Sequence, residues 1–209
     1  MGVLLPKWTM RLTIEMRNKT ALLGGSFDPV HIGHVNLFHN AYKLAHFSTL
    51  IVVPAFVSNF KQDATPASFS DRVEMLKLAI EDYRDLYPSD CLDIRVSQYE
   101  GEKKGVSYTS DTIKHFYESL EDNGKVNFII GDDILPDLYR WHDFEYIKNN
   151  VRFFCFSRLG AHDDNQVEID FIESPITVAS SSSIKEGMEG MLTKRVKEYI
   201  DEHKLYRAL

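Results

Sequence analysis

The sequence predicts an α/β fold, in which helices cover both faces of a doubly wound, mainly parallel sheet and a C-terminal helical segment follows. Short apolar runs alternate along the chain with segments whose apolar residues recur at helical spacing. Several of these runs end at glycine or proline, as buried strands do before a tight loop. Of the 209 residues 44% are hydrophobic and 26% are charged, a balance typical of a globular chain that folds by itself.

The sequence predicts six strands and three helices that alternate along most of the chain. The apolar runs predict strands at residues 21–25, 50–53, 92–96, 126–130, 151–156 and 167–172. The helical patterns predict helices at residues 34–47, 70–80 and 109–120, the second of them capped by Ser70. Right-handed crossovers between parallel strands then give a Rossmann-like sheet, and such sheets bind ligands at the carboxyl ends of their strands.

Charge and cysteine content exclude several classes of partner. With 24 basic and 31 acidic residues the net charge is −7, so we expect no nucleic-acid partner and no anionic membrane partner. No apolar run approaches the roughly 20 residues of a membrane span, and the charged N-terminus does not resemble a secretory signal, so a cytoplasmic location is expected. Cys91 and Cys155 lack metal-ligand spacing and are predicted to be reduced, largely buried thiols.

The chain length suits one domain. We expect residues 20–209 to form a single domain and residues 1–19 to be an N-terminal extension of uncertain role. The sequence leaves open whether the protein forms a homo-oligomer.

The segment GGSFDPVHIGH at residues 24–34 carries the main chemical signal. Gly24 and Gly25 let the backbone approach a bound group closely, and Gly33 permits a tight entry into the following helix. His31 and His34, three residues apart, can point the same way and donate hydrogen bonds to a phosphoryl group. Each feature alone is more often a plain turn or a surface histidine, but their order between a strand and a helix favours a phosphate site.

This segment resembles the signature of the nucleotidyltransferase superfamily, whose members attack the α-phosphate of a nucleoside triphosphate and release pyrophosphate. Further segments resemble the bacterial nicotinate-nucleotide adenylyltransferases of NAD biosynthesis. These segments are GVSYTSDT at 105–112, FIIGDDILPDLYRWHDFEYI at 128–147, FSRLG at 156–160, SSSSIK at 180–185 and YIDEHKLY at 199–206. In such proteins the first strand follows the initiator closely, so Met16 is a candidate start.

The resemblance implies a role for individual residues. The catalytic residues would be His31, His34 and Lys61, with Lys61 bridging the phosphates of donor and acceptor. The ATP-binding residues would be Gly24, Gly25, Ser26, Phe27, His34, Gly131, Asp133, Ser181, Ser182, Ile184 and Lys185. The acceptor-binding residues would be Ser26, Phe27, Lys61, Tyr108, Thr109, Trp141 and Arg158, with the pyridinium ring stacked on Trp141.

The implied reaction is adenylyl transfer from ATP to nicotinate mononucleotide, giving deamido-NAD and pyrophosphate. Magnesium would arrive with ATP, because phosphates and water commonly hold it without a protein cage. The sequence departs from the family pattern at Lys185, where arginine is usual, and at Ser58 to Phe60, where two prolines and a histidine are frequent. Nicotinamide mononucleotide or another phosphate-bearing acceptor, and a binding module without chemistry, remain alternatives.

Overall fold

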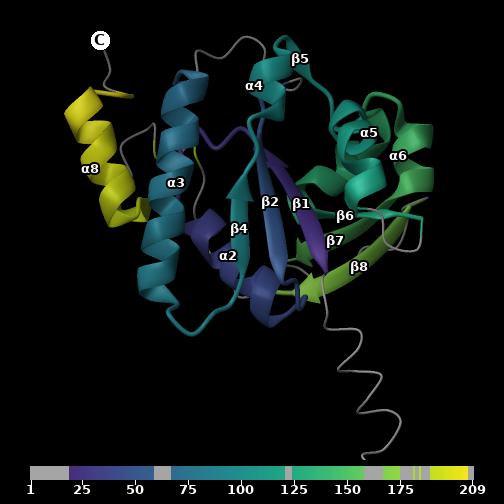
Figure 1. The fold of residues 1–209 in the computed structure, drawn as a ribbon, viewed down its shortest axis with the longest axis horizontal. Coiled ribbons are helices and arrows are strands. Elements are labelled where there is room, and N and C mark those ends of the chain that lie inside the picture. Colours follow the sequence, from purple (N-terminus) through teal and green to yellow (C-terminus); the bar gives the residue numbers. More distant parts are fainter. Residues whose placement is uncertain are drawn as a thin grey trace, which may run out of the picture.

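A computed structural model describes residues 19–58, 67–120, 124–157, 167–174, 181, 184 and 189–206 of the chain. Its main sheet has six parallel strands in the order β4-β2-β1-β6-β7-β8 (Figure 1). The strands are β1 (Thr20–Gly25), β2 (Thr49–Pro54), β4 (Asp93–Val96), β6 (Val126–Gly131), β7 (Val151–Ser157) and β8 (Glu168–Glu173). The α/β prediction and all six predicted strands are confirmed, with ends that differ by one or two residues.

Helices and shorter elements connect these strands. The helices are α2 (Ile32–Lys43), α3 (Phe69–Leu86), α4 (Tyr99–Lys103), α5 (Thr109–Leu120), α6 (Phe144–Asn150) and α8 (Lys194–His203), with 3₁₀ helices η1 (Asp132–Arg140) and η2 (Glu189–Met191). A separate pair of parallel two-residue strands consists of β3 (Val57–Ser58) and β5 (Val106–Ser107). The sequence did not predict α4, η1, α6 or this small pair, because each is too short to show a period.

Alternate residues of the strands feed two hydrophobic cores, one on each face of the sheet. On β1, Ala21 and Leu23 belong to the core that α2, α3 and α8 cover, whereas Leu22 belongs to the core beneath α5, η1 and α6. On β7, Phe154 and Phe153 divide in the same way. Two covered faces confirm the doubly wound arrangement, and they explain why the strands are apolar throughout rather than alternating.

The strand order places a crevice at the middle of the sheet. From β1 the chain proceeds outward to β2 and β4, and then it returns to β6 on the other side of β1. This is the 3-2-1-4-5-6 order in which ligands bind outside the carboxyl ends of the strands, at the point where the order reverses. Here that point lies between β1 and β6, so the segments after Gly25 and after Gly131 face the same crevice.

The predicted helix at 34–47 begins and ends earlier than expected. It begins at Ile32, with His31 as its N-cap, and ends at Lys43. The apolar pattern continued because Ala45 and Phe47 are both buried, but they reach the core from the loop after the helix. His46 in that loop has a left-handed φ of 57°, which no helix continues.

Two smaller predictions were wrong. The N-cap of α3 is Ser68 rather than Ser70, because the Ser68 hydroxyl accepts a hydrogen bond from the Asp71 N–H at 3.1 Å. Cys155 is buried as expected, but Cys91 is exposed, since it lies in the turn that precedes β4. Within the described part of the chain, no helix is both long and apolar enough to span a membrane.

Candidate active site

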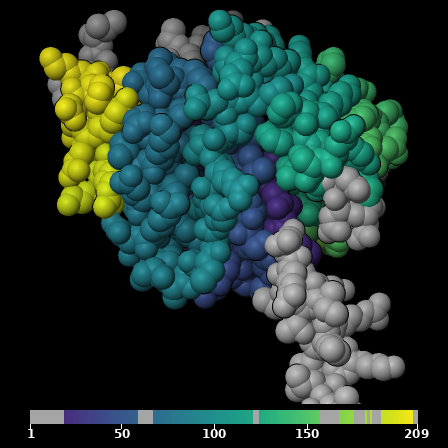
Figure 2. Space-filling model, viewed as in Figure 1, coloured from purple at the N-terminus to yellow at the C-terminus, as the bar shows by residue number. Residues whose placement is uncertain are grey.

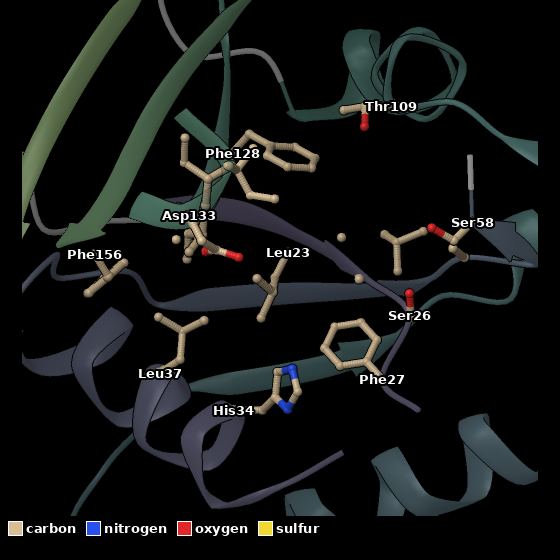
Figure 3. A pocket seen from close by; sticks show the side chains of 18 of the residues that line it. Leu23, Ser26, Phe27, His34, Leu37, Ser58, Thr109, Phe128, Asp133 and Phe156 are labelled. Atoms are coloured by element: carbon tan, nitrogen blue, oxygen red, sulfur yellow. The ribbon is translucent and has the colours of Figure 1, made fainter. Parts of the chain in front are cut away.

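A cavity of about 750 Å³ lies at the crevice between the carboxyl ends of β1 and β6, within the size range of small-molecule sites (Figure 3). It extends from Asp133, Leu37 and Phe156 at one end to Ser58 and Thr109 at the other, and the His34 ring lies between these ends. The cavity therefore has two ends of different composition, with His34 between them.

The loop after β1 forms the floor of this cavity. A Cβ atom at Gly25 would lie 3.0 Å from the Phe27 ring, closer than an ordinary van der Waals contact, so glycine suits the close approach of the loop to this ring. Phe27 itself is buried and has a positive φ of 49°, a conformation that is strained for a bulky residue. Such strain persists only where the surroundings over-determine it, and here it turns the chain toward α2.

The two histidines of the signature lie together at the start of α2. Their ring centroids are 3.9 Å apart, which confirms that they point the same way. The His31 backbone N–H donates to His34 Nδ1 at 3.2 Å, so in the neutral ring the proton is on Nε2. The first turn of α2 has no acidic side chain, and its N-terminus favours an anion. Gly33 lies inside this first turn rather than before it.

Burial changes the charge state of both rings. It lowers the pKa of His31 to about 4, since the side chain is only 7% exposed. Burial, and next the charge of His31, lower the pKa of His34 well below its usual value. In the free protein both rings are therefore neutral near pH 7, and they can act as neutral hydrogen-bond donors.

The end of β6 supplies a carboxylate to the cavity. Gly131 is the N-cap of η1, and Asp133 lies in the first turn of that helix. A Cβ atom at Gly131 would lie 2.5 Å from Asp133 Oδ1, so glycine at this position leaves room for the carboxylate. The Asp133 side chain projects into the cavity near Leu37 and Phe156 (Figure 3).

Aromatic and hydroxyl side chains line the opposite end. Tyr108 and Thr109 stand at the start of α5, and the Tyr108 ring lies 4.3 Å from the His142 ring. Trp141 follows η1 and packs edge-on against Phe128 and Phe153, with centroids 6.0 and 6.2 Å away. These edge contacts fix the orientation of the Trp141 indole. The residue also lines the cavity.

Three buried polar atoms in residues that line the cavity have no hydrogen-bond partner among the described residues. They are His31 Nδ1, Glu100 Oε2 and Trp141 Nε1. Buried polar atoms are nearly always paired in folded proteins.

The structure brings most of the predicted site residues together. The cavity is lined by Gly24, Gly25, Ser26, Phe27, His31, His34, Tyr108, Thr109, Gly131, Asp133, Trp141 and Ser181. Ser181 donates from its hydroxyl to the Pro29 carbonyl at 3.0 Å, which ties the serine segment to the signature loop. Ile184 is buried but does not line the cavity, so its contribution is to packing. Lys61, Arg158, Ser182 and Lys185 lie outside the described residues.

Sequence reasoning missed two buried charged residues near the site. Glu100, in the unpredicted helix α4, accepts a hydrogen bond from Thr112 on α5 and lines the cavity. Arg72 on α3 is 2% exposed and binds the loops that follow β1 and β2. The position of Arg72 on the apolar face of the α3 helical pattern could have indicated this role, because arginine is rarely buried unless its charge is paired or hydrogen-bonded.

The chain is similar to known proteins over most of its length. Residues 22–187 match the model of the family described as Cytidylyltransferase-like. A protein of Listeria innocua named "Probable nicotinate-nucleotide adenylyltransferase" is 33% identical over 91% of this chain and 98% of its own. A protein of Dehalococcoides mccartyi with the same name is 31% identical over 90% of this chain and 97% of its own.

A solved structure has the same fold. The Plasmodium falciparum nicotinic acid mononucleotide adenylyltransferase complexed with NaAD aligns with a TM-score of 0.73, covering 91% of this chain and 98% of its own. At 19% sequence identity this likeness bears on the fold alone.

Proposed function

Because the chain belongs to the cytidylyltransferase-like family and, within it, to the nicotinate-nucleotide adenylyltransferases, we propose that it transfers the adenylyl group of ATP to nicotinate mononucleotide. The products are deamido-NAD and pyrophosphate, and the reaction takes place in the cytoplasm. One observation carries the proposal: a single cavity joins His31 and His34 of the signature to Tyr108, Thr109 and Trp141 of the acceptor segments.

The two ends of the cavity suit two different substrates. Asp133 can accept hydrogen bonds from ribose hydroxyls of ATP, and Leu37 and Phe156 offer apolar surface beside it. At the other end Trp141 gives the pyridinium ring an aromatic face. With the substrates so placed, their phosphates meet beside His34, in the middle of the cavity.

Positioning and charge stabilisation account for the chemistry. The phosphate of the mononucleotide has a second pKa of about 6, so it is already a nucleophile near pH 7 and needs no general base. It attacks the α-phosphorus in line, the bond to the β-phosphate oxygen breaks, and pyrophosphate leaves. His31 and His34 donate hydrogen bonds to oxygens on which negative charge grows, while Lys61 and Lys185 are proposed to hold phosphates on either side.

The proposal includes magnesium, which would enter the site bound to ATP. Phosphate oxygens and water would hold the ion, and it would neutralise charge on the triphosphate. Among the described residues, no group of three His, Cys, Asp or Glu side chains is placed to hold a metal ion.

The test is pyrophosphate release from ATP with each candidate acceptor. We expect release with nicotinate mononucleotide and little without an acceptor. Nicotinamide mononucleotide must be included, because Glu100 lines the cavity and a carboxamide can donate a hydrogen bond to a carboxylate, whereas the carboxylate of nicotinate cannot. A higher kcat/KM with nicotinamide mononucleotide would overturn the proposed acceptor. If no tested acceptor gave pyrophosphate release, a binding module without chemistry would be favoured.

A further inference from the structure

We propose that Tyr206, in the C-terminal segment, is a positioning residue for the loop that carries the two histidines, and that it acts through the carboxylate of Asp28. The inference rests on the proposed function. It adds a residue near the C-terminus to the residues that shape the site. Asp28 lies three residues before His31, and Tyr206 lies 178 residues further along the chain.

The carboxylate of Asp28 is buried beneath the signature loop, and the residue is 6% exposed. The Tyr206 hydroxyl donates to Asp28 Oδ1 at 2.6 Å, and the Ala67 N–H donates to the same oxygen at 3.0 Å. A carboxylate that has left water depends on such donors, because an unpaired buried charge is costly. Its position, and with it the backbone of Asp28, is therefore tied to Tyr206 and Ala67.

Arg72 completes the frame around this loop. Its guanidinium donates to the carbonyl of Ser26 at 2.9 Å, and to those of Ala55 and Phe56 at 2.7 and 3.1 Å. The loops after β1 and β2 are thus joined through one side chain. Burial lowers the pKa of Arg72, and the nearby charge of Asp28 opposes that shift. Asp28 is therefore the meeting point of Tyr206 and the Arg72 frame.

Tyr206 is held in place by the docking of α8 on α3 (Figure 2). The Arg195 side chain donates to the buried carboxylate of Asp82 at 2.6 Å, and the Tyr199 hydroxyl donates to Asp71 at 2.9 Å. Beyond α8, Lys204 and Tyr206 both have left-handed φ values, 54° and 57°. For a tyrosine this conformation is uncommon, and it turns the end of the chain toward Asp28.

The phenol is suited to a constant donor role. Burial, and next its hydrogen bond to Asp28, raise the pKa of the Tyr206 hydroxyl far above its ordinary value. The hydroxyl therefore keeps its proton at any pH at which the enzyme works, and it always donates to Asp28. A change that removes only this oxygen withdraws a donor from a buried charge three residues from His31.

The experiment compares two matched variants, Tyr206→Phe and Tyr199→Phe. Each removes one hydroxyl of the C-terminal segment that donates to a carboxylate, but the acceptor of Tyr206 is Asp28 in the signature loop, whereas the acceptor of Tyr199 is Asp71 on α3. We expect Tyr206→Phe to lower kcat roughly tenfold with little change in KM for either substrate, as loss of a charge-assisted hydrogen bond allows. Tyr199→Phe should lower the melting temperature by a similar amount to Tyr206→Phe, but it should keep the wild-type kcat.

Equal kcat values for the two variants at temperatures well below melting would overturn the inference, because Tyr206 would then only stabilise the fold. A double-mutant cycle with Asp28→Asn adds a second criterion. If Tyr206 acts through the charge of Asp28, its removal should cost at least threefold less in a chain that already carries Asp28→Asn, and additive effects would count against it. A wild-type chain without any pyrophosphate release would instead refute the proposed function.

Discussion

At the scale of single residues, the neutral state of the two signature histidines shapes what they can do. Burial lowers the pKa of both rings, so near pH 7 each imidazole is neutral and carries one ring proton in the free protein. A neutral imidazole still donates one hydrogen bond, and for His34 the donor is Nε2 because Nδ1 accepts from the backbone. We expect the site to rely on fixed donors at the phosphates rather than on proton transfer.

Replacement of His34 tests this directly. His34→Ala should lower kcat by on the order of a hundredfold with the fold intact, as does removal of one donor from an oxyanion site. His34→Gln, whose amide can place a neutral N–H near the position of Nε2, should retain more activity than the alanine variant. Steady-state pyrophosphate release measures both, and His115→Ala, at an exposed position on α5, is the control. Near-normal turnover of His34→Ala would contradict the proposed role.

The depressed pKa of His31 also predicts how stability depends on pH. In the unfolded chain the ring takes up a proton below about 6.5, whereas in the native state it stays neutral down to about 4. The unfolded state then binds more protons, so stability is full above pH 6.5 and falls as the pH is lowered toward 4. The difference between the unfolded and folded pKa values of His31 corresponds to about 3 kcal/mol in the free energy of unfolding.

Urea unfolding at pH 7.0 and pH 5.0 measures this dependence. His31→Gln has no titrating group at this position, so it should lose less stability than the wild type between the two pH values. Parallel losses would show that His31 titrates normally in the folded protein.

At the scale of elements, the site depends on how α3 fixes the loops that leave β1 and β2. Arg72 contributes four hydrogen bonds to carbonyls of these loops and of Ala67 at the start of its own helix. Its flat guanidinium can serve several carbonyls in different directions, and the compact ammonium of a lysine cannot. Ser26 of the first loop and Ser58 beyond the second both line the cavity, on the same side of it (Figure 3), so Arg72 fixes how these loops are spaced there.

Arg72→Lys should accordingly lower the free energy of unfolding by about 2 to 4 kcal/mol, through carbonyls left without donors in a buried place. It should also raise KM, because the two loops, which both line the cavity, lose their common anchor. Arg84→Lys on the exposed face of the same helix is the matched control and should be neutral. Equal stabilities of the two variants would show that the Arg72 contacts are replaceable.

At the scale of the whole molecule, the described fold and cavity are built from residues after Lys19. The described strands, both cores and the residues that line the cavity lie between Thr20 and Tyr206. We propose that residues 20–209 are one domain and that residues 1–19 are an extension whose removal leaves the activity unchanged.

A chain that begins at Met16 should have the melting temperature and kcat of the full chain, since it keeps all of β1. A chain that begins at Gly24 removes Leu22 and Leu23 from the two cores and should not fold. Thermal unfolding and pyrophosphate release measure both. A marked loss of activity in the Met16 chain would assign a function to the extension.

The sequence by itself was sufficient for the six strands of the main sheet, for the helices α2, α3 and α5, and for the family. Buried parallel strands are apolar runs and long helices have a period, so β1, β6 and α5 could be located from composition and spacing. The segment GGSFDPVHIGH could be interpreted because its chemistry is local: strand, glycines, histidines and helix follow within a few residues. The family that this segment and the acceptor segments predicted is confirmed by relatives that span nearly the whole chain.

Only the tertiary structure determined which distant residues meet. The hydrogen bonds of Arg72 to two loops, of Glu100 to Thr112 and of Tyr206 to Asp28 have no sequence period, because they join segments that the sheet order brings together. The charge state of the signature histidines likewise follows from burial, which no local pattern reports. The segment at 24–34 thus identifies the chemistry, while its geometry is set from α3 and from the C-terminal end of the chain.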